Sequence, residues 1–193
     1  MSRGLRLAVF VVVALVQLAV AGGAIVKSEL ALRTGEPFRF RIQPVDPVDA
    51  FRGRYVAIHV ALDHAPAPDD FDIRAGSMIF VPVEVDADGY AAFGEASRNP
   101  PGHGSYLRLR SGPVSVDDDG SRRVWVTVPF RRFYLDEDLA PDAERAVWGG
   151  RRGRREASVI VRIRNGVGVI EELSIDGVPI REWLENNRFN VSR

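Results

Sequence analysis

Residues 44–63 read PVDPVDAFRGRYVAIHVALD, and they predict a stiff corner followed by a β-strand. Pro47 lacks an N–H and pushes Asp46 toward an extended conformation, and Gly53 supplies a position where φ > 0 costs little. From Tyr55 onward every second side chain is apolar and branched, which is typical of a strand with one buried face. That face would hold Val56, Ile58, Val60 and Leu62.

Charged residues crowd this corner. With Gly53 and Tyr55 they form a candidate functional corner: Asp46, Asp49, Arg52, Gly53, Arg54 and Tyr55. In one interpretation the two acids accept backbone N–H bonds in turns and pair with the arginines. In the other, the carboxylates or the arginine pair bind a ligand or catalyse a reaction. Because buried charges need partners, both interpretations predict that the four charges contact one another.

The Pro-x-Asp-Pro-x-Asp order followed by Arg-Gly resembles the signature of the GDYXXLXY family. Gly53 and Tyr55 match that pattern, and the apolar Ile58 stands at its Leu. Arg54 replaces its Asp, and Val60 replaces its final Tyr. Further similarity follows at residues 129–134 (PFRRFY) and 175–177 (IDG). The resemblance implies a membrane-anchored bacterial protein with no assigned activity.

Residues 7–26 form an apolar run whose single strongly polar residue is Gln17. About twenty residues at about 1.5 Å each span the roughly 30 Å hydrocarbon core of a bilayer. Arg3 and Arg6 precede the run, which predicts a cytoplasmic N-terminus and an extracytoplasmic remainder. The alternative is a signal peptide cleaved after Ala19-Val20-Ala21, but the run exceeds the usual apolar region of such peptides. We therefore expect an anchor in residues 1–27 and a body in residues 28–193.

Composition excludes several function classes. The formal net charge is +0, so no overall basic field favours nucleic acid. The chain contains no cysteine, which excludes disulfides, thiol nucleophiles and thiolate metal sites. Lys27 is the only lysine among the 26 basic residues and lies at the membrane edge, so Schiff-base and P-loop chemistry are close to excluded. We expect no cofactor.

The rest of the chain alternates short apolar strands with turns. Turn signals are Asp86–Gly89, Asp117–Gly120 and Asn165-Gly166, and residues 65–70 read as a surface loop. Strands are expected at 38–42, 55–62, 77–85, 90–96, 106–110, 124–130, 159–163 and 169–175, and helices at 140–148 and 179–187. The prediction is a mainly β fold, an antiparallel barrel or sandwich with two short capping helices, preceded by one N-terminal transmembrane helix.

The histidines favour no metal site. His59, His64 and His103 match no common ligand spacing, even with Asp63 as a carboxylate partner, and we expect no metal. His59 is expected to be packed, with one hydrogen bond. The Gly-rich basic run at 149–155 is expected to be a solvated loop, with contact to anionic lipid as the alternative.

Three functions remain open. The leading one is a non-catalytic, extracytoplasmic interaction or accessory domain that partners an integral membrane protein through the candidate corner. A second is a cell-envelope hydrolase using Asp46 and Asp49 as paired carboxylates. A third is a small-ligand or glycan-binding domain whose pocket is lined by Tyr55, Trp125 or Tyr134.

Overall fold

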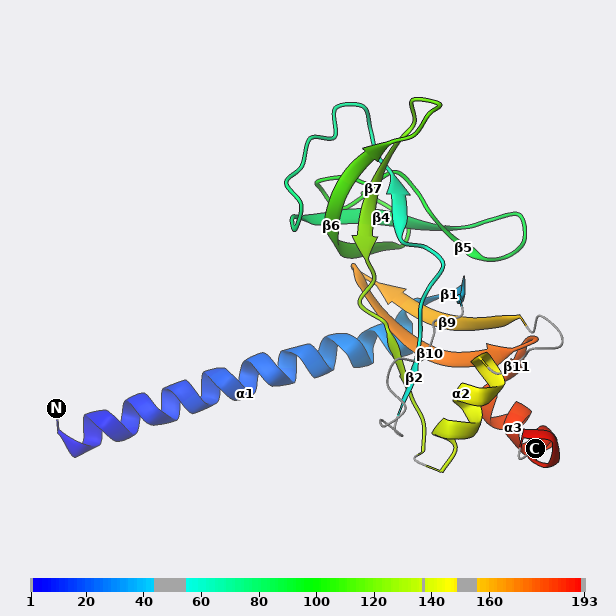
Figure 1. Ribbon diagram of the computed structural model, residues 1–193. Coiled ribbons are helices and arrows are strands. Elements are labelled where there is room, and N and C mark those ends of the chain that lie inside the picture. The colour runs from blue at the N-terminus through cyan, green and yellow to red at the C-terminus, as the bar shows by residue number, and fades with distance from the viewer. Residues whose placement is uncertain (1, 44–54, 137, 149–155, 192–193) are drawn as a thin grey trace.

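A computed structural model describes residues 2–43, 55–136, 138–148 and 156–191 of the chain. One long helix precedes a body made mostly of short strands (Figure 1). The elements are α1 (Arg3–Thr34), β1 (Glu36–Arg41), β2 (Tyr55–Ala57), β3 (His64–Pro66), β4 (Met78–Val85), β5 (Ala91–Phe93), β6 (Tyr106–Val116), β7 (Arg122–Thr127), β8 (Arg132–Tyr134), α2 (Ala140–Trp148), β9 (Ala157–Arg164), β10 (Val167–Ile175), β11 (Val178–Pro179) and α3 (Ile180–Val191).

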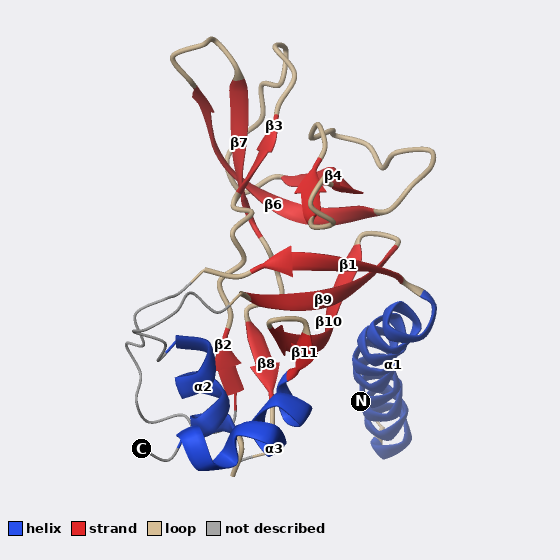
Figure 2. Ribbon diagram, turned by 90° about the vertical axis from the view of Figure 1, so that its right-hand side faces the viewer, coloured by secondary structure: helices blue, strands red, loops and turns tan. Residues whose placement is uncertain are grey.

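The named strands are grouped in three antiparallel sheets. One sheet has the order β1-β9-β10-β11, a second the order β3-β7-β6-β4-β5, and β2 pairs with β8. The five-stranded sheet forms the upper part of the molecule in Figure 1, and α2 and α3 lie together at the opposite end (Figure 2). The expected mainly β, antiparallel fold with two short helices is confirmed.

A single apolar core joins the sheets. Phe40 of β1 is fully buried, and its ring contacts Phe93 of β5 and Phe130 edge-on, with centroids 6.4 and 5.3 Å apart. Such edge-to-face pairs are favourable beyond the area that they bury. The three rings therefore connect the four-stranded sheet to the five-stranded sheet and to the segment between β7 and β8.

Helix α1 leaves the body at one side, and within it only Ala31 is buried (Figure 1). The amide of Gly35 donates to the carbonyl of Ala31 at 2.8 Å and ends the helix. A side chain at Gly35 would lie 3.0 Å from the backbone of Ile163 in β9, so the chain needs glycine here to fit against the sheet. By length and composition α1 is the one described helix that is apolar enough to cross a membrane.

Local sequence signals predicted the turns and helices well. Gly89 and Gly120 end their turns at φ +83° and +84°, and Asn165-Gly166 has the two positive φ values of a type I′ hairpin, +48° and +81°. Helix α2 has the expected bounds, and Ile180, Trp183 and Leu184 form the buried stripe of α3. Residues 28–34 continue α1.

Other expectations were wrong. Residues 65–70 do not begin as a surface loop, because Ala65 and Ala67 are buried and β3 pairs with β7. The strand expected over residues 55–62 is regular only to Ala57, although its alternation persists in burial. Val85 alternates in phase with Ile79, Val81 and Val83, which predicts burial, but it lies beyond the core at the end of β4 and is 61% exposed. His59 is exposed, not packed.

Candidate functional site

The segment at residues 55–66 changes its strand partner twice. Its ends pair with one run of chain, as β2 with β8 and as β3 with β7. Its middle pairs instead with the residues just after β1. The contacts are the Ile42–Val60 bridge and a hydrogen bond that the amide of Gln43 donates to the carbonyl of His59 at 2.8 Å. The amide of Ile58 still donates to the carbonyl of Arg131 at 2.9 Å, and that of Val126 to the carbonyl of Asp63 at 2.8 Å. Between these two bonds, residues 59–62 and 127–130 diverge.

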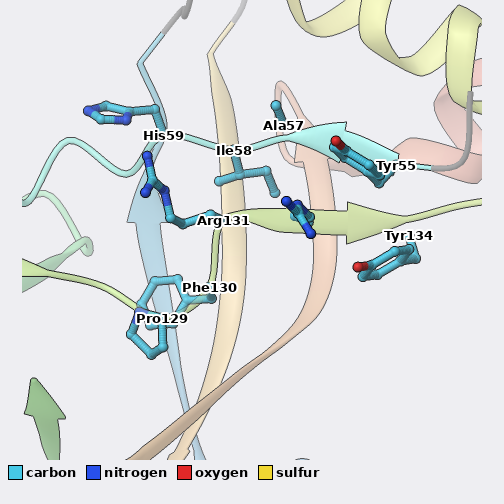
Figure 3. Close-up of a pocket in the computed structure, with 9 residues that line it drawn as sticks. Tyr55, Ala57, Ile58, His59, Pro129, Phe130, Arg131 and Tyr134 are labelled. Atoms are coloured by element: carbon cyan, nitrogen blue, oxygen red, sulfur yellow. The ribbon is translucent and has the colours of Figure 1, made fainter. Parts of the chain in front are cut away.

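A cavity of about 650 Å³ lies at the β2–β8 end of this divergence (Figure 3). We call it the Tyr55–Tyr134 pocket. It is lined by Tyr55, Ala57, Ile58, His59, Pro129, Phe130, Arg131, Arg132 and Tyr134. Its floor is apolar because Ile58 and Phe130 are buried. Pro129 has no N–H to continue a ladder, which helps to keep the two segments apart here.

Two tyrosines form one wall of the pocket. Tyr55 and Tyr134 are directly opposite in the β2–β8 pair, and their rings meet edge-on with centroids 5.9 Å apart (Figure 3). The guanidinium of Arg132 stacks over the Tyr55 ring at 4.9 Å. Tyr134 is 66% exposed, so its ring face and hydroxyl are free to meet a ligand.

The lining is cationic. Arg131, Arg132 and His59 are exposed, and none of the nine lining residues is acidic. Figure 3 shows the guanidinium of Arg131 extending toward the segment that carries His59. Arginine donates bidentate hydrogen bonds to carboxylate and phosphate groups, and aromatic rings stack on planar or sugar groups. The lining is therefore suited to an anionic ligand with a flat or ring-shaped portion.

A smaller hollow of about 140 Å³ continues the pocket toward β3 and β7. It shares Ile58, His59 and Arg131 with the larger pocket and also contains Asp63. The carboxylate of Asp63 accepts a hydrogen bond from Nδ1 of His64 at 2.8 Å. In the described part of the chain no serine hydroxyl is bonded to His64, so this pair lacks the third member of a hydrolase triad.

Most residues of the predicted candidate corner lie outside the described ranges. Asp46, Asp49, Arg52, Gly53 and Arg54 lie outside the described residues, and of the candidate corner only Tyr55 is described. Tyr55 and Tyr134, both expected for a ligand-binding pocket, do come together. Trp125 does not join them, because it is paired with His64 at the β3–β7 end, with ring centroids 6.0 Å apart.

Sequence reasoning missed the two pocket arginines. Arg131 and Arg132 lie between Phe130 and Phe133, in a block noted only for its family resemblance. The available signal was two adjacent arginines in an apolar, aromatic run, directly before a tyrosine. Their pairing with residues 55–59 depends on contacts between distant parts of the chain, which no local pattern reveals.

A second polar cluster joins the sheets and is separate from the pocket. The buried Tyr90 donates its hydroxyl to Glu156, and Arg39 and Arg41 stack on its ring at 5.0 and 3.9 Å. Burial, followed by the bond to Glu156, raises the pKa of Tyr90. Backbone N–H groups, that of Tyr90 foremost, lower the pKa of Asp86, which also pairs with Arg41 at 3.2 Å. We interpret this cluster as structural.

No group of three or more His, Asp or Glu side chains in the described ranges is arranged to hold a metal ion. His64 is engaged by Asp63 and lies 3.5 Å from a guanidinium nitrogen of Arg123, a cationic neighbour that disfavours a metal ligand.

Comparisons with known proteins identify the family alone. The family model described as GDYXXLXY protein matches residues 17–173, which run from the middle of α1 into β10 and include every residue of the Tyr55–Tyr134 pocket. Neither the curated proteins nor the solved structures gave a match. Because the matched range covers most of the chain, the protein belongs to the GDYXXLXY family.

Proposed function

We propose that this chain is a single-pass membrane protein whose extracytoplasmic β body is a non-catalytic recognition module. The observation that carries the proposal is α1. Its apolar run at residues 7–26 is exposed along its length, and the same helix continues to Ala31, which packs against the body. An apolar helix exposed in this way is stable in lipid, not in water.

In the proposal α1 is an uncleaved anchor. Arg3 and Arg6 precede the apolar run, and by the positive-inside rule they hold the N-terminus in the cytoplasm. An enzymatic reporter fused after residue 193 is expected to be active on the extracytoplasmic side. The protein is expected to remain in membranes washed with alkaline carbonate. A soluble product lacking the first residues would support a cleaved signal peptide and contradict the anchor.

The proposed partner is an integral membrane protein of the same membrane. Two observations support this choice. Gln17 is the single strongly polar residue of the apolar run, and polar side chains in lipid favour contact with another helix. Helix α1 also reaches the body without a loop, so the body is held close to the bilayer. The cationic Tyr55–Tyr134 pocket is the proposed contact surface, and it suits an acidic segment of the partner.

Photocrosslinking in native membranes tests the contact. A photoreactive phenylalanine derivative at Tyr134 is expected to form an adduct with a membrane protein. The adduct should be lost in Arg131→Glu/Arg132→Glu, because two repulsive charges then face the acidic segment. The same derivative at Val116, which is 64% exposed at the end of β6, is the control and should form none. An adduct that survives the charge reversal would contradict the proposed surface.

A small anionic ligand is the second candidate, because a cavity of about 650 Å³ is within the range of small-molecule sites. The full chain purified in detergent is then expected to carry a non-protein mass in native mass spectrometry. That mass should disappear in Arg131→Glu/Arg132→Glu, whereas a partner protein alone would leave no such mass. The hydrolase alternative depends on Asp46 and Asp49, which lie outside the described residues.

A further inference from the structure

A hydrogen bond joins the start of the β4–β6 pair to the first residue of β1, directly after α1. The hydroxyl of Ser105, just before β6, donates to the carboxylate of Glu36 at 2.7 Å. Glu36 is the first residue after Gly35, where the helix ends. The amide of Val83 in β4 in turn donates to the carbonyl of Ser105 at 2.9 Å. The pair therefore begins beside the C-terminal end of the helix.

From this point the pair runs back along the helix. β4 follows the direction of α1 in Figure 1 and is foreshortened with it in Figure 2. One end of β4 leads to Asp86, which Arg41 binds at the far end of β1. The other end, where Met78 pairs with Arg110, therefore points toward the apolar part of α1.

The reach of the pair matches the length of the exposed helix. From Val83 to Met78 the strand advances five residues, or roughly 17 Å at about 3.3 Å per residue. The same distance along a helix is about eleven residues at about 1.5 Å each. Counted back from Gly35, it ends at Ala24, two residues inside the end of the apolar run at Val26. Met78 is thus brought level with the point where α1 would leave the hydrocarbon.

The side chains on the outer face of β4 and β6, near Met78, are of the types found at membrane interfaces. Met78 is 39% exposed, and the Phe80 and Tyr106 rings meet edge-on at 5.8 Å beside it. Arg108 is exposed. Its amide donates to the carbonyl of Gly166 at 2.9 Å, but its guanidinium has no hydrogen bond or ion pair among the described residues. In the same ranges the guanidinium of Arg110 makes only a 3.4 Å bond to the carbonyl of Gly76. We call this surface the β4–β6 face: Met78, Phe80, Tyr106, Arg108 and Arg110.

We propose that the Met78–Arg110 end of the β4–β6 face reaches the phospholipid headgroups of the leaflet next to the body. Met78 lies at the boundary between headgroups and acyl chains, and Arg110 and Arg108, which are opposite Met78 and Phe80, bind anionic phosphate groups. The Phe80 and Tyr106 rings lie successively farther from the hydrocarbon, because β4 runs along α1. The inference rests on the proposed membrane anchoring and adds a second attachment at a fixed side of the body. The pocket tyrosines belong to a different pair, β2–β8, and remain free for a partner.

The absence of cysteine makes a direct test simple. Met78→Cys and Val85→Cys place single fluorophores at the two ends of β4, and Val85 is exposed like Met78. The full chain is reconstituted in nanodiscs of phosphatidylcholine with phosphatidylglycerol, and a nickel-chelating headgroup quenches nearby fluorophores. We expect strong quenching at position 78 and little at position 85. Equal quenching at both positions overturns the proposal.

Charge variants then test the arginines. Arg108→Gln/Arg110→Gln is expected to lower the ratio of docked to undocked body about fivefold per arginine, as is removal of the anionic lipid. Arg123→Gln, on β7 of the same sheet, is the matched control and should leave quenching unchanged. If quenching at position 78 is the same after the double arginine substitution and after removal of the anionic lipid, the proposed role of the arginines is overturned. Co-purification of every variant with the nanodisc shows that α1 still anchors the chain. Loss of co-purification would contradict the proposed anchor, whereas loss of quenching alone bears on the headgroup contact.

Discussion

The guanidinium of Arg132 lies 4.9 Å from the centre of the Tyr55 ring, although the two residues are not paired in the ladder. Tyr55 is opposite Tyr134, and Arg132 is opposite Ala57, so the contact is a diagonal across β2 and β8. Both strands have only three residues, and this contact fixes their register while it orients the guanidinium over the pocket. In a pair of strands this short, side-chain contacts contribute to the stability of the pairing as well as backbone hydrogen bonds.

The Arg132–Tyr55 contact is expected to contribute a coupling energy of about 0.5–1 kcal/mol, typical of an exposed cation–π pair. A double-mutant cycle with Arg132→Gln and Tyr55→Leu measures it from thermal unfolding in detergent. Arg131→Gln with Tyr55→Leu is the control cycle and should be nearly additive. A coupling in the control as large as in the test would show that the effect is general pocket electrostatics.

Gly168→Ala is expected to destabilise the body by about 1–3 kcal/mol, because the core has no room for one more methyl group. The new Cβ would lie 2.8 Å from Cδ2 of Leu107 and 3.1 Å from the ring of Phe130. Shortening the neighbour should relieve part of this clash, so Gly168→Ala/Leu107→Val is expected to lose less stability than the two single changes added. Urea unfolding of the four proteins checks this, and simple additivity would refute the clash.

Glu172→Gln is expected to raise the melting temperature at neutral pH. Burial raises the pKa of Glu172, so the folded state binds its proton more tightly than the unfolded state does. Wild-type stability then falls as pH rises through the raised pKa, and the amide avoids that loss. The advantage of the variant should shrink as pH falls to the ordinary glutamate range of about 4.

Glu171→Gln is the neighbouring control for this change. Its carboxylate receives two bonds from Arg162, at 2.8 and 2.9 Å, so its loss should lower the melting temperature at neutral pH. Melting curves that shift in the same direction for both variants would contradict the burial argument.

Asp86→Asn is expected to reduce stability at neutral pH and to flatten its decline in acid. The Tyr90 amide, then that of Asp88, then Arg41 hold the pKa of Asp86 below its usual value. A lowered pKa contributes stability above the ordinary aspartate range that is lost as pH falls through the lowered value. Melting temperatures between about pH 2 and 7 check this. Asp118→Asn, an exposed change in the turn between β6 and β7, is the control for the loss of one surface carboxylate.

Sequence predicted those parts of the fold whose cause is local. Asn165-Gly166 needs only two residues that tolerate positive φ, and α2 needs only its own periodicity and Pro141 near its start. Strands of two or three residues carry no such period. β3 and β8 are fixed by distant partners, and prolines at 66 and 68 concealed the alternating burial of Ala65 and Ala67.

The same limit applies to the site. Tyr55 and Tyr134 were recognisable as candidates from residue type, but their edge-to-face contact depends on a strand pairing across almost eighty residues of chain. Arg131 and Arg132 became site residues only through that pairing. Trp125 looked equivalent by type, yet its partner is His64, because β3 and β7 pair in their own register.

Gly35 joins α1 directly to β1, because its amide closes the helix and its carbonyl accepts a hydrogen bond from Arg162 of β9. In a bilayer such a joint would act as a lever arm, so that any tilt or rotation of the helix would swing the whole body through the same angle. The body would stay within a thin layer above the bilayer surface. It would meet its targets by two-dimensional diffusion. Targets beyond that layer would be out of its range.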